Sequence, residues 1–210
     1  MITLANKAII YIKQTGGPQI GGPQIPVTVR VEWLADGKIK PLTCWTPDNS
    51  CYDFKYIYES TQLAFLKERG EGIRYKVRAE SKYLSEHDGL RHTWHDIYLY
   101  FADNRFCEKG FIDERYKHKG KKYVPVILDI FPDGDYELVY FWVGDNRYRV
   151  ERTNNKEPRG SFHAGGIGIR HNVDVRLVNP DNDEDPDPNK SIRRPAALYW
   201  ELNKWFIANR

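Results

Sequence analysis

Residues 27–45, VTVRVEWLADGKIKPLTCW, recur in altered form as residues 124–142, VPVILDIFPDGDYELVYFW. In both copies an apolar, β-branched run leads to an Asp-Gly pair, and a second run ends in tryptophan. The two Asp-Gly pairs are 97 residues apart (133 − 36), and so are Trp45 and Trp142 (142 − 45). An Asp-Gly pair between two β-branched runs is typical of a tight hairpin turn. The sequence therefore predicts a β-hairpin that occurs twice.

The repeat continues beyond this hairpin. LKERGEGIRYKV (66–77) matches FHAGGIGIRHNV (162–173), and LYFADNRF (99–106) matches LYWELNKW (198–205). A period near one hundred residues is the size of a small domain. Several short strands separated by turn signals favour a small barrel or sandwich. We therefore expect an all-β protein made of two tandem homologous units, each a small SH3-like or OB-like β-barrel.

The expected organisation has four parts. Tandem GGPQI motifs follow a short apolar stretch near the start, and Gly-Gly-Pro cannot continue a ladder of strand hydrogen bonds. A run rich in lysine separates the two copies. We expect an N-terminal strand and Gly/Pro-rich arm at 1–26, the first repeat at 27–111, a basic linker at 112–122 and the second repeat at 123–210.

Composition and cysteine content indicate the cellular compartment and the class of partner. A net charge of +3 and an isoelectric point near 8.6 are only mildly basic, whereas dedicated duplex-binding domains usually carry a clustered excess. Three cysteines are an odd number, unlike the even framework of a secreted disulfide scaffold. No signal peptide or membrane-spanning run is evident. We expect a cytoplasmic protein without a membrane partner.

Two motifs carry a resemblance. They are HAGGIGIR at 163–170 and LYW at 198–200, the latter followed by Trp205-Phe206. With the Asp-Gly hairpin, they resemble the short uncharacterised β-proteins of Firmicutes and their mobile elements, which read like a single copy of this unit. The first copy departs from the pattern, because Glu68-Arg69 replaces Ala-Gly and Phe106-Cys107 replaces Trp-Phe. The resemblance implies a β-fold and a bacterial or phage-like cytoplasmic setting, and it implies no activity.

The Gly-x-Gly-Ile-Arg segments are the candidate ligand site. Glycines let successive backbone N–H groups converge on an anion, and an arginine that follows adds a bidentate partner. The alternative is that the glycines begin a strand and the arginine covers the end of the barrel. Neither the Rossmann nor the P-loop pattern is satisfied. The candidate anion-binding residues are Gly70, Gly72, Arg74, Gly166, Gly168 and Arg170.

The sequence contains no motif that matches a standard metal or catalytic site. His87, His92, His95 and Asp96 fall in one insertion, with Cys107 nearby, but their spacing matches no standard zinc site. The alternating aspartates at 181–187 lack the glycine and glutamate of a calcium loop. We expect solvated loops in both places, and we assign no metal, no cofactor and no catalytic residue.

Aromatic residues near the end of each copy offer another interpretation. Side chains of this kind stack on bases in single-strand binding proteins, although alternating aromatics in small barrels usually form core. The residues concerned are Tyr98, Tyr100, Phe101, Tyr199, Trp200, Trp205 and Phe206.

Together these observations favour a non-enzymatic binding or interaction protein, in the setting of a bacterial or phage mobile-element accessory factor. The expected partner is a protein or an acidic ligand. Linking two weak modules raises avidity, so duplication itself is consistent with binding. One alternative is a nucleic-acid-binding protein that uses the barrel faces. Another is an enzyme with a metal or acid–base site in the histidine-rich insertion.

Overall fold

The computed structural model contains β-strands and no helix in the residues that it describes, which confirms the all-β prediction. None of these residues belongs to a helix that could cross a membrane. The described residues are 10–14, 24–64, 71–85, 89–102, 121–160, 167–179, 193–201 and 204–208.

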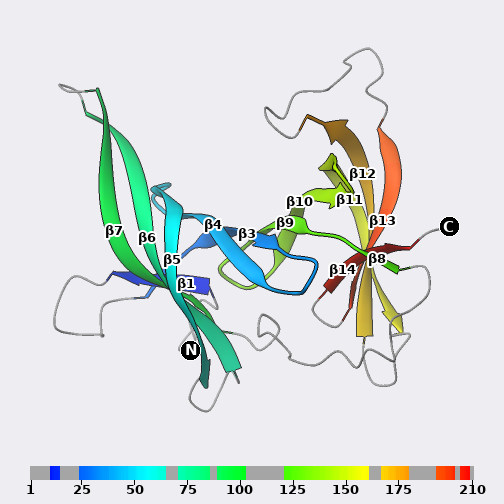
Figure 1. Ribbon diagram of the computed structural model, residues 1–210, viewed down its shortest axis with the longest axis horizontal. Helices are drawn as coiled ribbons and strands as arrows, with labels where there is room; N and C mark the ends of the chain where they lie inside the picture. Colours follow the sequence, from blue (N-terminus) through cyan, green and yellow to red (C-terminus); the bar gives the residue numbers. More distant parts are fainter. Residues whose placement is uncertain are drawn as a thin grey trace, which may run out of the picture. The chain divides into compact units, whose positions relative to one another are not determined.

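The strands form one sheet of 14 members. Figure 1 shows the course of the chain through them. They are β1 (Ile10–Gln14), β2 (Ile25–Pro26), β3 (Thr28–Trp33), β4 (Ile39–Trp45), β5 (Cys51–Ala64), β6 (Glu71–Ser85), β7 (Gly89–Phe101), β8 (Lys121–Tyr123), β9 (Val126–Ile130), β10 (Tyr136–Val143), β11 (Asn146–Gly160), β12 (Ile167–Val178), β13 (Arg194–Glu201) and β14 (Lys204–Ala208). Their order is β2-β1-β7-β6-β5-β4-β3-β9-β10-β11-β12-β13-β14-β8.

This order corrects the expectation of two closed barrels. Among the described strands the sheet is open, with β2 and β8 at its edges. The reason is that β3 and β9, which begin the two repeats, pair with each other. A barrel closes when its first strand pairs with its own last strand. Here β3 has β4 on one side and β9 on the other, so its edge is already occupied.

The described residues fall into two compact units. Unit 1 draws on 1–31, 41–107 and 129–136, and unit 2 draws on 32–40, 108–128 and 137–210. The hairpin turn of the first copy, Asp36-Gly37, is therefore part of unit 2. The turn of the second copy, Asp133-Gly134, is part of unit 1. Each unit contains the tip of the other copy's first hairpin.

Both predicted hairpin turns are confirmed. Gly37 and Gly134 have φ angles of 95° and 86°, which only glycine adopts at no steric cost. Their N–H groups donate to the Leu34 and Phe131 carbonyls, both at 2.9 Å. The sequence signal and the turn geometry therefore agree in both copies.

The strand pairing repeats with the same offset as the sequence. In β5–β6 Tyr52 lies opposite Ser81, and in β11–β12 Tyr148 lies opposite Leu177, so that both strands are displaced by 96 residues (148 − 52; 177 − 81). Both pairs are interrupted by two β-bulges. In β5 the bulges fall between Phe54 and Tyr56 and between Ile57 and Glu59; in β11 they fall between Val150 and Arg152 and between Thr153 and Asn155. The bulges also match at an offset of 96.

The N-terminal strand occupies the same position in the first copy as β14 does in the second. β1 pairs with β7, with Tyr11 opposite Tyr100, and β14 pairs with β13, with Phe206 opposite Tyr199. The Val27 N–H donates to the Ile10 carbonyl at 3.2 Å. In the second copy, the Val124 N–H donates to the Trp205 carbonyl at 3.0 Å. β1 is thus the positional counterpart of β14, although it comes from the opposite end of its copy.

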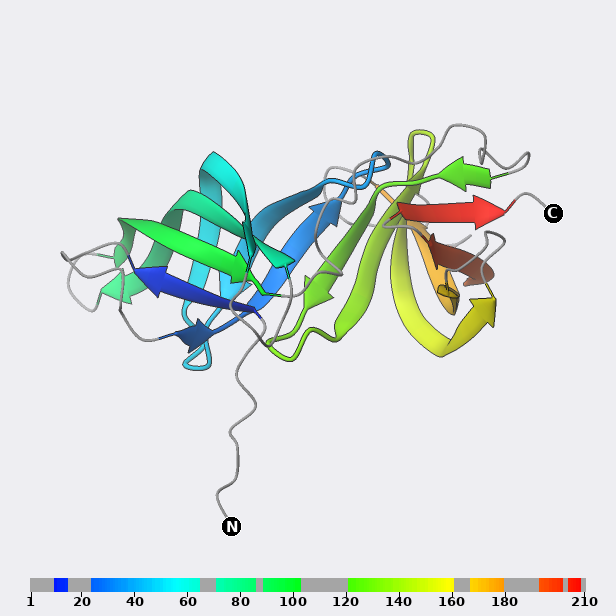
Figure 2. The same cartoon turned by 90° about the horizontal axis from the view of Figure 1, so that it is seen from below.

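The core follows the period-two alternation of the first strands. One face of each is buried at equivalent positions: Val27, Val29, Val31 and Trp33 in the first copy, and Val124, Val126, Leu128 and Ile130 in the second. A bidentate ion pair lies on the other face, where the Arg30 Nε and Nη2 donate to the two Asp129 carboxylate oxygens at 2.7 Å each. Figure 2 shows both units with their curved strands from a second direction.

The tryptophans that end the hairpins are less buried than the sequence suggests. A tryptophan at the end of an apolar run predicts a core residue, but Trp45 and Trp142 are both half-buried. The preceding residues, Cys44 and Phe141, take the buried positions instead. Because neighbouring strand residues point to opposite faces, each tryptophan turns outward. An arginine covers its ring, with Arg30 lying 5.2 Å from the Trp45 centroid and Arg147 lying 5.6 Å from the Trp142 centroid.

Candidate binding surface

The predicted anion-binding residues lie on strands where the structure describes them. Gly72 is opposite Leu63 in β6, and Gly168 is opposite Arg159 in β12. Gly70 and Gly166 lie outside the described residues. The convergence of backbone N–H groups that we predicted around these four glycines therefore stays a prediction.

Arg74 and Arg170 occupy equivalent places and each has a carboxylate beside it. The Arg74 Nη2 lies 3.2 Å from the Glu59 Oε1, and its guanidinium lies 5.0 Å from the Tyr98 ring centroid. The Arg170 Nη1 lies 4.0 Å from the Glu157 Oε2. The carboxylates come from neighbouring strands within the same units. An external anion at either arginine would have to compete with this internal partner.

His92 and His95 lie on strand β7 and not in the solvated loop that we expected, and they do not converge. The His92 Nδ1 lies 2.6 Å from the Glu80 Oε1, whereas the His95 Nε2 lies 2.8 Å from the Ser81 Oγ. Glu80 and Ser81 are consecutive residues of β6, so they point to opposite faces of the sheet and hold the two histidines apart. No group of three metal-ligating side chains occurs in the part of the chain that is described. His87, Cys107 and the aspartates at 181–187 lie outside that part.

The two bulges of β5 turn aromatic side chains outward. Before the first bulge, Tyr52 and Phe54 lie opposite Ser81 and Ala79, on the inner face of β6. After it, Tyr56 lies opposite Arg78, an exposed residue of the outer face. A bulge adds one residue to a strand and so shifts the alternation of its side chains. In a regular strand without this bulge, Tyr56 would lie on the same face as Phe54, because the two residues are two positions apart.

Three large rings surround a single arginine on this outer face. Tyr56 is 60% exposed, Tyr58 is 51% exposed and Trp94 is 46% exposed. The Arg78 guanidinium lies 5.3 Å from the Trp94 ring centroid. A hydrogen bond to Tyr58, and the nearby charge of Asp96, raise the pKa of Arg78. These four side chains line a shallow hollow of about 410 Å³.

Further ring and cation pairs continue along the same face. The Lys76 Nζ lies 5.8 Å from the Tyr58 ring centroid, and the Lys13 Nζ lies 5.9 Å from that of Tyr100. Tyr11 and Tyr100 stack with centroids 4.8 Å apart at one end, where both are buried. We call the outer surface of β5, β6, β7 and β1 the aromatic–cation face. Its members are Lys13, Tyr56, Tyr58, Arg74, Lys76, Arg78, Trp94, Tyr98 and Tyr100.

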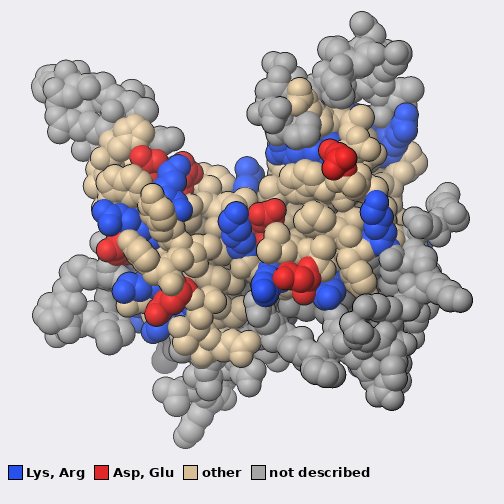
Figure 3. All heavy atoms as spheres, in the orientation of Figure 1, with Lys and Arg blue, Asp and Glu red and all other residues tan. Residues whose placement is uncertain are grey.

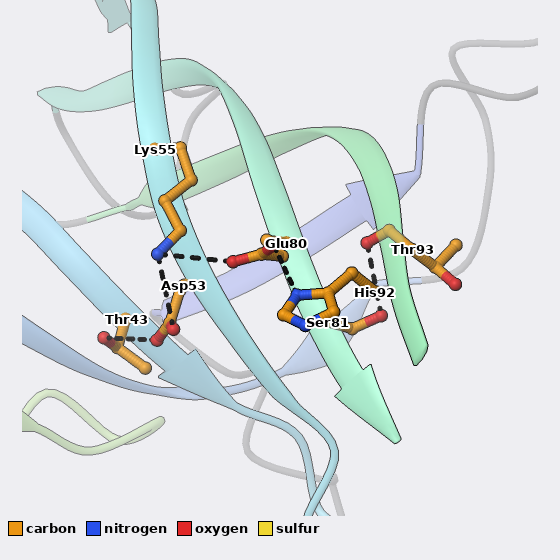
Figure 4. A network of polar contacts seen from close by, with 7 residues as sticks. All are labelled: Thr43, Asp53, Lys55, Glu80, Ser81, His92 and Thr93. Carbon is orange, nitrogen blue, oxygen red and sulfur yellow. Dashed lines mark hydrogen bonds and ion pairs between the residues drawn. The ribbon is translucent and has the colours of Figure 1, made fainter. Parts of the chain in front are cut away.

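A chain of polar contacts that includes Glu80, the residue of β6 opposite Trp94, links four strands (Figure 4). The Lys55 Nζ lies 3.3 Å from the Glu80 Oε2 and 3.7 Å from the Asp53 Oδ2. The Thr43 hydroxyl donates to Asp53 at 3.2 Å. The hydrogen bond with His92, followed by the contact with Lys55, lowers the pKa of Glu80. Lys55 is thus a cation held between two carboxylates of neighbouring strands.

The same face of the second copy has different chemistry. The counterparts of Tyr56, Tyr58 and Arg78 at the offset of 96 are Arg152, Asn154 and Asp174. Trp94 corresponds to Arg193 at the offset of 99 that relates β7 to β13.

Hydrogen bonds among polar side chains replace the exposed rings on this second face. The Asn172 Nδ2 donates to the Glu157 Oε1 at 3.2 Å, and the Asn155 Nδ2 donates to the same oxygen at 2.8 Å. The backbone bulges are shared, whereas the exposed rings are particular to the first copy.

The aromatic residues singled out from the sequence are mainly structural. Phe101, Tyr100 and Trp205 are buried, and Tyr98, Tyr199 and Trp200 are half-buried. The side chain of Phe206 is not described. The exposed rings were missed, because the aromatic alternation of YDFKYIYES predicts a strand with one apolar face and does not reveal a bulge. The one feature of this segment that could have indicated exposed rings is its number of tyrosines, which exceeds what a single buried face of a strand needs.

Charges of both signs are mixed on the face of the molecule that Figure 3 shows. In the view of Figure 3, basic and acidic side chains are interspersed over both units, with uncharged surface between them. We found no match to the chain among protein-family models, curated proteins or solved structures.

Proposed function

We propose that this chain is a non-catalytic binding protein and that the aromatic–cation face of the first copy is its binding surface. The observation that carries this proposal is the cluster of Tyr56, Tyr58 and Trp94 around Arg78, each ring about half exposed. Tyrosine, tryptophan and arginine are the residues most enriched where binding energy is concentrated. Exposed apolar groups that gather on one face mark interaction sites.

The second copy supports this assignment. It shares the strand pairing and both bulges, yet polar residues stand at the equivalent outer positions. The fold therefore does not require rings there, and their presence in the first copy calls for another explanation. Binding supplies one, since a ligand that covers the rings removes their apolar surface from water.

We further infer that the two halves arose by tandem duplication of one β-unit. The matching register and the paired bulges support this inference. In this view the second copy provides scaffold and the first copy acquired the ligand surface. The resemblance to short Firmicute and mobile-element β-proteins, and a cytoplasmic setting, stay part of the proposal.

Site-specific photocrosslinking in cells tests the proposed surface even though its ligand has not been identified. A photoreactive phenylalanine analogue replaces Tyr56 in one variant and Arg152, its counterpart, in another. We expect a crosslinked adduct from position 56 and none from position 152. The adduct should disappear when Trp94→Ala is added, because that ring forms one wall of the hollow.

Equal adducts from both positions would refute the assignment, as would an adduct at position 152 alone or none at either. Circular dichroism spectra that match the unmodified protein provide the folding control.

A further inference from the structure

We propose that the ligand of the aromatic–cation face is an unpaired nucleic-acid strand. This inference rests on the proposed function, because it names the ligand of that same surface. Three features support it: the open rings, the regular placement of the cations and the mixing of basic with acidic groups on the face that Figure 3 shows.

The rings provide stacking platforms of the kind that bind single strands. Every base has a π-face, so that stacking on aromatic side chains tolerates any sequence. Tyr58 and Trp94 are each about half open to solvent, and they line one shallow hollow with Tyr56. A base that has no pairing partner can enter such a hollow.

The cations recur at a regular spacing. Arg74, Lys76 and Arg78 alternate along the outer side of β6, and residues two apart on a strand are separated by about 7 Å. Each lies over an aromatic ring of a neighbouring strand, at 5.0 to 5.8 Å from its centroid. A row of rings and cations suits a polymer that repeats a flat group and a negative charge. Glu59 and Asp96 offset part of this charge, which indicates moderate affinity.

A duplex fits the face less well. Its bases are already stacked and paired, so that only its phosphates would contact the protein. Phosphate contacts alone require many cations, yet basic and acidic groups are interspersed in the view of Figure 3 and the net charge is only +3. A protein partner would use the same rings without the repeated charges, and the experiment below includes that outcome.

Fluorescence anisotropy with labelled 12-nucleotide oligonucleotides tests the ligand class. The probes are a thymidine homopolymer, a mixed-sequence single strand and a duplex of the same mixed sequence. We expect the full-length protein to bind both single strands at least about tenfold more tightly than the duplex. Two or three phosphate contacts predict a slope of about −1.4 to −2 for log K against log salt concentration, at about −0.7 per contact.

Variants then locate the binding. Trp94→Ala should weaken single-strand binding at least about fivefold, because base stacking on one aromatic ring is lost. Lys76→Gln should weaken it uniformly across sequences and reduce the salt slope by about 0.7. The matched control, Arg193→Ala at the counterpart of Trp94, should leave affinity unchanged.

The outcomes separate the two proposals. If the wild-type protein binds no oligonucleotide while the photoreactive analogue at position 56 crosslinks to a protein partner, the ligand assigned here is wrong and the binding surface stands. If single strands bind equally well to wild type and Trp94→Ala, the face is not their site and the ligand assigned here is wrong, while crosslinking from position 56 decides whether the binding surface stands. Equal affinity for the duplex would exclude base stacking and overturn the inference.

Discussion

Strands β5 and β11 are the same structural element with different outer surfaces. Both carry two bulges, at positions 96 residues apart, opposite equivalent residues of β6 and β12. In β5 the bulges present Tyr56 and Tyr58 to solvent, whereas in β11 they present Arg152 and Asn154. The bulge therefore fixes where a side chain points and leaves its chemistry open. One copy can thus change its surface without altering the pairing that holds the sheet.

The largest expected effects on the free energy of unfolding come from truncating buried side chains of β1 and β14, the two strands that occupy equivalent positions. Trp205 in β14 is 1% exposed, and Ile10 at the corresponding place in β1 is fully buried. Trp205→Ala should reduce the free energy of unfolding by about 3–5 kcal/mol, and Ile10→Ala by about 2–5 kcal/mol. Urea unfolding followed by circular dichroism measures both. A loss below about 1 kcal/mol for Ile10→Ala would show that β1 is not a working counterpart of β14.

A buried position that differs between the copies should make stability depend on pH. His171 is fully buried against Trp205, and burial, followed by the charge of Lys156, lowers its pKa to about 4 from an ordinary value of 6.5. The unfolded chain therefore binds a proton that the folded protein excludes, and stability falls as the pH drops from 6.5 towards 4. The shift corresponds to a loss of about 3 kcal/mol.

The part of this dependence that comes from a buried histidine should belong to the second copy. The counterpart of His171 in the first copy is Tyr75, which is also buried and carries a phenol in place of the imidazole. We expect His171→Phe to flatten the stability profile between pH 6.5 and 4, as measured by urea unfolding at several pH values. We expect Tyr75→His to steepen it. An unchanged profile in His171→Phe would assign the acid sensitivity to other groups.

Adjacent residues of β10 should differ in their cost of truncation. Phe141 is buried and stacks on Tyr148 with centroids 5.2 Å apart, so Phe141→Ala should cost about 3–5 kcal/mol. Trp142 is only half-buried and Arg147 covers it, so Trp142→Ala should cost about 1–2 kcal/mol. Thermal and urea unfolding of the two variants provide the comparison. A larger loss of unfolding free energy for Trp142→Ala than for Phe141→Ala would show that the tryptophan is the core residue of the pair.

The smallest effect on stability is expected at the aromatic–cation face. Tyr56→Ser and Trp94→Ser remove rings that are about half exposed, so each should change the free energy of unfolding by less than about 1 kcal/mol. Binding of a single-stranded oligonucleotide should nonetheless fall sharply in both. If either variant unfolds, its ring is structural, and the contrast with the second copy loses its functional meaning.

The parts of the fold that depend on local chemistry could be predicted from the sequence. The Asp-Gly turns follow from the freedom of Gly37 and Gly134 to adopt positive φ, and the buried faces of β3 and β9 follow from alternation. The open sheet was not predictable, because it depends on β3 pairing with β9, far away in the sequence. No local residue pattern specifies which distant strand occupies an edge.

The candidate surface was hidden for a related reason. A bulge between Phe54 and Tyr56 reverses the alternation without any glycine or proline to mark it. The sequence motif that drew attention instead led to Arg74 and Arg170, each of which has a carboxylate beside it. Arg74 nevertheless belongs to the aromatic–cation face. Sequence reasoning therefore reached Arg74, Tyr98 and Tyr100 of this surface and missed the exposed rings of Tyr56, Tyr58 and Trp94 that distinguish it.

Transplanting the surface between the copies is the decisive test of the binding role assigned to the first copy. The first protein carries Tyr56→Arg, Tyr58→Asn and Trp94→Arg, which place the second copy's residues at the three ring positions of the first and leave Arg78 unchanged. The next protein adds Arg152→Tyr, Asn154→Tyr, Asp174→Arg and Arg193→Trp, which recreate the hollow on the matching bulges.

The affinity of each protein for the 12-nucleotide thymidine strand, by fluorescence anisotropy, is the measurement. We predict that the first protein loses binding, because each lost base stack lowers the affinity by about ten- to a hundredfold. The second protein should regain an affinity within about tenfold of wild type. Retained binding in the first protein, or no recovery in the second while both stay folded, would contradict this prediction.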